Sequence, residues 1–133
     1  MSLSGTTVAA LGALVVAATT VRGQEEAPTV PSGLTLTLQE VREEPQPDGA
    51  LWLRFRYVAP GLTRDQRDRI EADFEALCQS QALAYVPVAG NPAAEAIISI
   101  ASEPVEFGSS APDVTQFFEA FRLAGGACIW EAF

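Results

Sequence analysis

The chain has 133 residues, 48% of them hydrophobic, and a formal net charge of −9 at pH 7. This length suits one globular domain with a modest core, because a domain near this size buries roughly two thirds of its unfolded surface. All eight basic residues are arginine, and histidine is absent. We expect no nucleic-acid partner, because phosphate binding requires clustered cations.

The amino terminus contains an apolar run at residues 8–18 that fits the hydrophobic part of a secretory signal and is too short to span a bilayer. Small residues at Val21 and Gly23 precede the polar Gln24, which predicts cleavage after Gly23. We therefore expect a signal peptide at 1–23, a spacer at 24–32 and a single domain at 33–133. The mature protein would be periplasmic or secreted, with no stable membrane span. The alternatives are an uncleaved anchor and a buried core segment.

Export would place the two cysteines, Cys78 and Cys128, in an oxidising compartment. An even cysteine count in a small exported domain predicts a disulfide, so these two residues should be bonded to each other. Closing a loop of this length would stabilise the fold by about 4 kcal/mol in the chain-entropy model.

Two strands are predicted in the first half of the domain. Leucines alternate with polar residues at 34–38, residues 43–49 predict a turn, and apolar residues alternate again at 51–57, which suggests a hairpin. The polar face of the second strand carries Trp52, Arg54 and Arg56, a weak candidate binding surface. The alternative is a solvated face on which the arginine stems cover the indole.

A helix is predicted at residues 63–79. Thr63 and Gln66 form a capping-box pattern at its start. Helical spacing then places Ile70, Phe74, Leu77 and Cys78 on one apolar stripe.

Two further strands are expected after the helix, one at 82–88, interrupted by Pro87, and a buried one at 96–102. Residues 103–113 contain two prolines, a glycine and two serines, which predicts a long surface loop. Loops of this kind often carry function, so Phe107 joins the weak binding candidates.

Gly125 and Gly126 predict a tight turn between strands at 114–123 and 127–133. The resulting register pairs Leu123 with Cys128 and Phe121 with Trp130. It places Cys128 and Trp130 on a face that covers the core, with Cys128 directed toward the helix. The expected fold is α+β, an antiparallel sheet of about five or six strands with one amphipathic helix on one face, linked to the C-terminal hairpin by a disulfide.

Four stretches resemble a known family: WLRF at 52–55, PVEFG at 104–108, DVTQFFEAFR at 113–122 and GACIWEAF at 126–133. In this order they are similar to small exported bacterial proteins grouped as a domain family of unknown function. The similarity extends over residues 30–133, and the last two stretches are its most specific part. The resemblance implies a Gram-negative periplasmic or secreted protein, and it carries no catalytic residue or ligand.

The composition leaves little catalytic chemistry. Without histidine, and with both cysteines bonded, we expect no nucleophile–histidine pair, metal site or cofactor. Carboxylates remain: Glu119 falls on the core face, and Glu40 continues the inward row of leucines, so both are weak candidates for a general acid. The alternative is that they are open to water or paired with arginine. Acids at 103, 106 and 113 suggest calcium, but their spacing matches no standard loop.

The sequence therefore favours an exported, non-enzymatic interaction or envelope accessory protein with an unknown macromolecular partner in the cell envelope. The alternatives are a small carboxylate-dependent hydrolase and a purely structural role without a specific partner.

Overall fold

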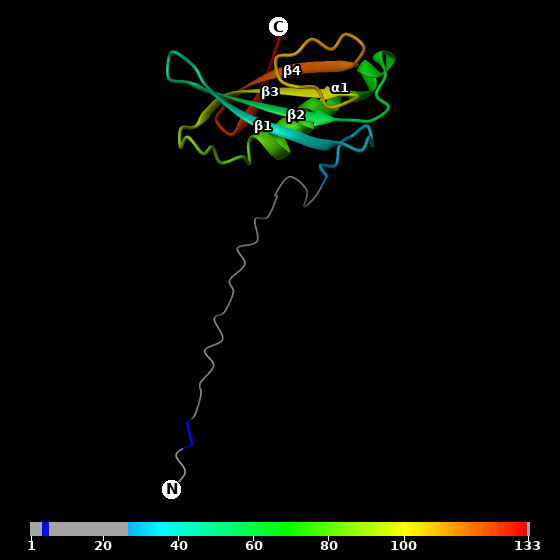
Figure 1. Cartoon of the computed structure of the whole chain (residues 1–133). Helices are drawn as coiled ribbons and strands as arrows, with labels where there is room; N and C mark the ends of the chain where they lie inside the picture. The colour runs from blue at the N-terminus through cyan, green and yellow to red at the C-terminus, as the bar shows by residue number, and fades with distance from the viewer. Residues whose placement is uncertain (1–3, 6–26, 133) are drawn as a thin grey trace.

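The computed structural model describes residues 4–5 and 27–132 (Figure 1). Its strands are β1 (Thr37–Pro45), β2 (Leu51–Val58), β3 (Ala93–Ala101), β4 (Gln116–Ala124) and β5 (Ala127–Glu131), and its α-helix is α1 (Arg67–Leu77). Apart from residues 4–5, the predicted signal peptide and its cleavage site lie outside the described residues. Within the predicted spacer, Val30 is buried, and the Ser32 amide and hydroxyl donate to Asp73.

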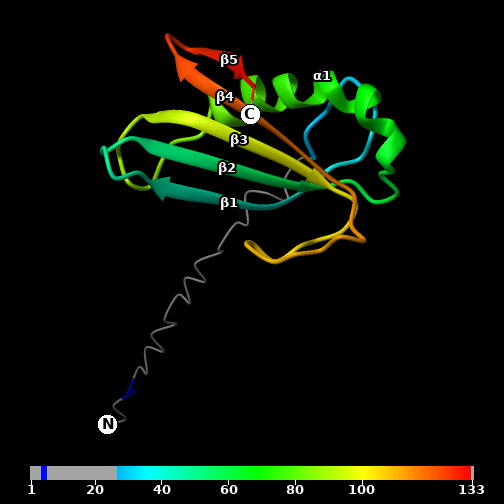
Figure 2. The same ribbon diagram turned by 90° about the horizontal axis from the view of Figure 1, so that it is seen from above.

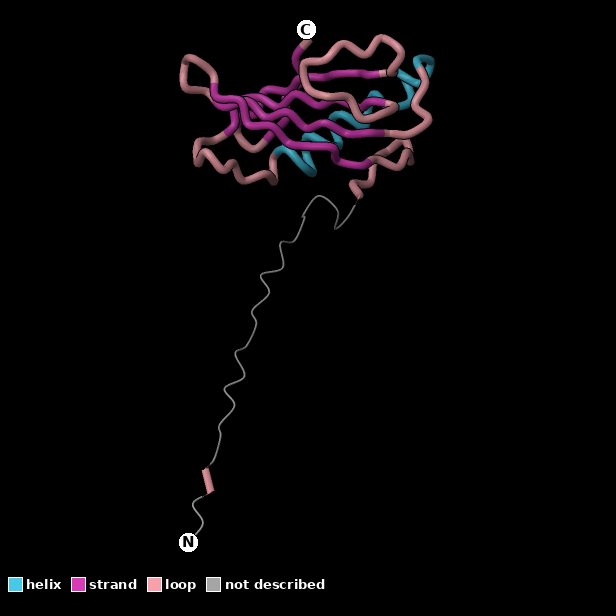
Figure 3. Tube along the Cα trace, viewed as in Figure 1, coloured by secondary structure: helices cyan, strands magenta, loops and turns pink. Residues whose placement is uncertain are grey.

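The strands form one sheet in the order β1-β2-β3-β4-β5. The tube in Figure 3 shows the strands running side by side, with the helical segments behind them. Three of the four neighbouring pairs are antiparallel, but β2 and β3 are parallel. The expectation of a purely antiparallel sheet was therefore wrong. The reason is the helix between β2 and β3, because a strand, a crossover helix and a second strand form the unit that joins parallel neighbours.

The helix lies where the sequence predicts it, although its α-helical part is shorter than residues 63–79. A 3₁₀ turn at Arg64–Gln66 precedes α1, and a π-helical turn at Cys78–Ala82 follows it. The predicted capping box is present, with the Thr63 amide donating to the Gln66 side chain at 3.0 Å. The whole predicted apolar stripe is buried: Ile70, Phe74, Leu77 and Cys78.

Figure 2 shows that α1 covers one face of the sheet and that the long β3–β4 loop lies on the opposite side. The inward residues of β2 and β3 alternate along the strands and pack with the helix stripe in one core, as Leu53, Phe55 and Ile98 do. We call the other side of the sheet the open face. On β2 it carries the predicted polar row, because alternate residues of a strand point to opposite sides.

One strand prediction was wrong, and another was wrong in its bounds. Residues 82–88 form no strand in the structure, and the first strand begins at Thr37 and continues through Pro45 instead of ending near 38. The turn is consequently short, with the Gln46 amide donating to the Ala50 carbonyl at 2.7 Å.

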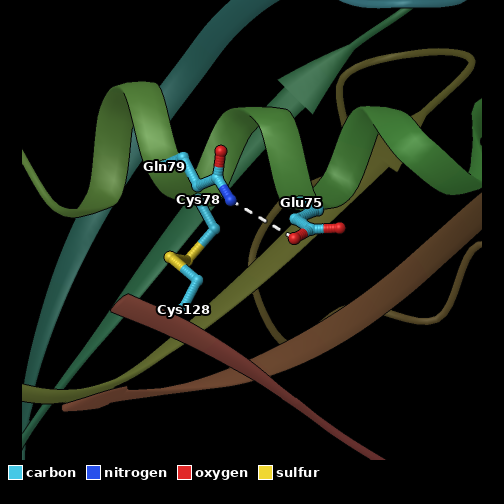
Figure 4. The surroundings of a disulfide bond; sticks show 4 residues. All are labelled: Glu75, Cys78, Gln79 and Cys128. Carbon is cyan, nitrogen blue, oxygen red and sulfur yellow. Dashed lines mark hydrogen bonds between the residues drawn. A yellow bond between two sulfur atoms is a disulfide. The ribbon is translucent and has the colours of Figure 1, made fainter. Parts of the chain in front are cut away.

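The C-terminal hairpin has the predicted register, with Leu123 opposite Cys128 and Phe121 opposite Trp130. Cys128 is bonded to Cys78, which confirms the predicted disulfide (Figure 4). Trp130, however, is 60% exposed, so the inner face of the hairpin does not cover the core along its full length. Because Trp130 lies on the edge strand β5, its indole ring extends past the packed interior.

Within the described part of the chain, we find no helix with the length and apolar character needed to cross a membrane.

Candidate functional site

The two candidate carboxylates, Glu40 and Glu119, lie on opposite faces of the sheet. Glu119 is opposite Ile98 on the helix side, as predicted. Glu40 does not continue the inward row, because an irregularity between Leu38 and Glu40 shifts the register and places it opposite Arg56 on the open face. The two carboxyl groups therefore cannot flank one scissile bond.

Glu119 is 7% exposed, and both of its oxygens are occupied. Arg67 donates to Oε1 at 2.5 Å, and the indole of Trp130 donates to Oε2 at 2.7 Å. The carboxylate lies beside a groove of about 460 Å³ between α1 and Trp130. These contacts come from α1, β4 and β5, so Glu119 links the helix to the C-terminal hairpin.

Arginines gather on the open face around one phenyl ring. The guanidinium carbons of Arg42, Arg54 and Arg56 lie 4.0, 5.4 and 5.5 Å from the ring centroid of Phe107, within the range of cation–π attraction. Arg56 is 6% exposed and donates to the carbonyl of Val105 at 2.6 Å. These contacts hold the β3–β4 loop against the sheet.

The loop and the sheet enclose a pocket of about 240 Å³. Its walls combine cationic, hydroxyl, amide and aromatic side chains, and we call it the arginine pocket; among its lining residues are Arg54, Arg56, Ser99, Phe107, Gln116 and Phe118. Of the four predicted binding residues, the structure brings Arg54, Arg56 and Phe107 together here. Trp52 lies outside the pocket, between Glu44 and Glu95 of the neighbouring strands.

The carboxylates of β1 neutralise part of this cationic surface. Glu40 accepts from Arg56 at 2.7 Å, and both oxygens of Glu44 lie 2.8 Å from Nε of Arg54. Arg42 lies farther away, at 3.6 Å from Glu40, and its Nε is buried without a hydrogen-bond partner among the described residues.

The family comparison finds a match to the family of unknown function DUF6497 over residues 10–133. The chain belongs to this family. Membership confirms the resemblance at the family level, while bacterial origin and export stay predictions. The comparisons with curated proteins and with solved structures find no match for this DUF6497 chain.

A second carboxylate cluster lies on the open face of this family member, beyond Trp52. Glu95 is opposite Arg122, which lies 3.5 Å from Glu131. Burial, then a hydrogen bond with Glu131 and its charge, raise the pKa of Glu95 to about 7, and Arg122 opposes the shift. In the described part of the chain, no group of three acidic or cysteine residues is arranged to hold a metal ion, so the calcium idea gains no support.

Sequence reasoning missed several residues of the arginine pocket, among them Ser99 and Phe118. Ser99 is the single polar residue inside the run AIISIA, a signal that could have marked it. Phe118 is its direct partner on β4 and is 42% exposed. Only the strand register places Ser99 opposite Arg56 and Phe118 opposite Ser99.

Proposed function

We propose that this protein is a non-enzymatic binding domain, exported to the periplasm or secreted, and that it contacts a macromolecular partner of the cell envelope through the arginine pocket. The observation that carries the proposal is the pocket itself. It joins Arg54 and Arg56 of β2 to Phe107 of the loop, three residues that sequence reasoning named separately.

The rim of the pocket supports a role in binding. Phe107 and Phe118 are 41% and 42% exposed, although large aromatic side chains are usually buried. Exposed aromatic residues beside arginine are typical of the residues that contribute most to interfaces. Such a rim favours contact with a partner.

The carboxylates support binding over catalysis. The sequence contains no histidine. Glu40 and Glu119 are separated by the sheet, and Glu119 is held by Arg67 and Trp130. A hydrolase that uses two carboxyl groups would need both on one side of a cleft.

Export is supported by two independent features. The apolar run at 8–18 has the length of a signal, and the Cys78–Cys128 disulfide is compatible with an oxidising compartment. Disulfides are rare in proteins that stay in a reducing cytosol.

Site-specific photo-crosslinking in the native host tests this proposal. A photoreactive phenylalanine analogue replaces Ser109, which lines the pocket, or, as a matched control, the exposed Ser80. We expect an adduct of discrete mass in the envelope fraction from position 109 and none from position 80. The adduct should disappear when Arg54→Gln is added.

An absent adduct at position 109, in protein shown to be disulfide-bonded and located in the envelope, would contradict the proposed partner. Equal adducts from both positions would also contradict it, because the contact would then be unrelated to the arginine pocket.

A further inference from the structure

We infer that the arginine pocket binds a carboxylate attached to a compact apolar group, a chemistry shared by small arylalkanoic acids and by the carboxyl-terminal residue of a polypeptide. This inference rests on the proposed binding role of the pocket and adds the chemical class of its ligand.

The polar end of the ligand is indicated by donors that the protein itself does not use. Arg54 bonds Glu44 through Nε, and its two terminal nitrogens donate to no described residue. Ser99 lines the pocket, and its hydroxyl forms no hydrogen bond with the described part of the chain. The residue as a whole is 3% exposed, but its hydroxyl oxygen is not fully buried, so it opens into the pocket and is free to bond a ligand. A guanidinium presents a fork that matches a carboxylate.

The charge of the ligand follows from the ion pairs around the pocket. Three guanidiniums, Arg42, Arg54 and Arg56, face two paired carboxylates, Glu40 and Glu44. Arg42 lies beside the pocket without lining it, whereas the exposed Glu106 does line it. With Glu106 counted, three carboxylates balance the three guanidiniums. A ligand with one negative charge therefore fits better than a doubly charged phosphate, which would meet stronger repulsion from these carboxylates.

The apolar end of the ligand is indicated by the other walls. Ile97, Phe107 and Phe118 line the pocket beside the polar groups. Its volume of about 240 Å³ lies below the roughly 300–1,000 Å³ of sites for drug-sized ligands. The size favours a group as large as one phenyl ring on a short chain.

Titration of the isotope-labelled, disulfide-bonded protein, followed by amide resonances in NMR, tests the inference. The probe is 3-phenylpropanoate, and the matched control is the neutral 3-phenylpropanamide. We expect saturable shifts at Ser99, Gly108 and Gln116 with the acid, and affinity at least about tenfold weaker with the amide, because the charge-assisted hydrogen bonds are lost. Inorganic phosphate should produce no saturable shift at these amides.

Variants locate the contact without depending on one substitution. Arg54→Gln should lower the affinity for 3-phenylpropanoate at least about tenfold. Arg54→Lys keeps the positive charge but loses the forked guanidinium, so its affinity should lie between those of Arg54→Gln and the unmodified protein. Ser99→Ala removes one hydroxyl that the fold does not use, so it should weaken binding several-fold with an unchanged melting temperature. Ser80→Ala, on the exposed helical turn, should change neither quantity.

The peptide Gly-Ser-Gly-Phe, with a free or an amidated carboxyl terminus, distinguishes the two sources. Tighter binding of the free-terminus peptide than of 3-phenylpropanoate assigns the site to chain ends, and weaker binding assigns it to small acids. Equal binding of the acid and its amide, binding of phosphate, or shifts away from the pocket would overturn the inference.

The two proposals can fail separately. A partner crosslinked at position 109, together with no saturable shift from either carboxylate probe, would leave the proposed function in place and overturn the ligand class. Binding of the acid in the pocket without any crosslinked partner would support the ligand class and overturn the proposed macromolecular partner.

Discussion

Two tyrosine hydroxyls packed against the helix-covered face of the sheet differ in their hydrogen bonding. The hydroxyl of Tyr57 is buried and has no partner in the described part of the chain, whereas that of Tyr85 donates to Glu43 at 2.8 Å. A buried polar group without a partner lowers stability, because on folding it loses its hydrogen bonds to water and gains none within the protein. The two residues therefore form a matched pair for mutation.

Tyr57→Phe should raise the free energy of unfolding by about 1 kcal/mol, because it removes the unpaired hydroxyl and keeps the ring. Chemical denaturation followed by tryptophan fluorescence measures the change.

Tyr85→Phe is the matched control and should lower the free energy of unfolding by about 1 kcal/mol, because Glu43 then loses one of its donors. A loss of stability in Tyr57→Phe would show that its hydroxyl has a partner, such as an ordered water.

Glu95 makes the stability of the folded protein depend on pH. Its folded-state pKa is raised from 4.5 to about 7, so the native state binds more protons than the unfolded state between these values. The stabilising contribution of Glu95 is therefore complete below about pH 4.5 and is lost as the pH rises through about 7. Burial is the main cause of the raised pKa, followed by Glu131, whereas Arg122 on the same face opposes the shift.

Glu95→Gln should remove this dependence, because glutamine resembles the protonated acid at every pH. The variant should gain stability relative to the unmodified protein as the pH rises, measured as the difference between their melting temperatures across the titration. A constant difference would show that Glu95 titrates normally. Glu103→Gln, on the exposed loop, is the control and should show no such trend.

At the level of elements, local patterns predicted the helix and the C-terminal hairpin well. The capping box at Thr63 and the glycine turn at Gly125 depend only on neighbouring residues, and both are present. The parallel pairing of β2 with β3 was missed because residues 82–88 were interpreted as another strand, which would have allowed the chain to return in the antiparallel sense. Without that strand, the regular structure between β2 and β3 is entirely helical.

Contacts between distant segments account for what the sequence could not predict in the site. Gln39 lies at the register shift in β1, and its side chain donates to the carbonyl of Val105 in the β3–β4 loop. The alternation of leucines gives no sign of this shift, so Glu40 was assigned to the wrong face. Likewise, nothing local shows that Phe107 folds back over Arg54, because their contact depends on the whole sheet.

Glu43 organises the segment that replaces the missed strand. Its carboxylate accepts from the hydroxyl of Tyr85 and from the amides of Val88, at 2.7 Å, and Ala89, at 3.0 Å. The two amides, followed by Tyr85, lower the pKa of Glu43. One side chain of β1 thus holds the connection to β3.

Glu43→Gln should release this connection, because an amide oxygen is a weaker acceptor than a carboxylate. We expect hydrogen exchange at the amides of Val88 and Ala89 to rise about tenfold or more, with the exchange of β2 unchanged. Glu75→Gln, a contact of Gln79 on the exposed side of α1, is the control. Unchanged exchange at both amides would mean that Glu43 does not hold the segment.

For the whole molecule, the Cys78–Cys128 bond joins the helical segment to the edge strand across 50 residues of chain. Strand β5 has only β4 as a neighbour in the sheet, and part of its side-chain surface is exposed. The disulfide and the Glu119 contacts with Arg67 and Trp130 help to fasten this hairpin to α1, in addition to the packing of Phe121 in the shared core. Domains of this size have small net stabilities, so one covalent link has a large effect.

Replacing both cysteines by alanine should therefore lower the free energy of unfolding by about 4 kcal/mol, the chain-entropy value for a loop of this length. Reduction of the disulfide in the unmodified protein should lower the free energy of unfolding by the same amount, so the two experiments measure this loss independently. Protein retained in the cytosol by deletion of residues 2–23 should match the reduced form, whereas protein recovered from the envelope should have no free thiol and begin at Gln24. Free thiols in the exported protein, or equal stability of the oxidised and reduced forms, would contradict a fold that depends on its compartment.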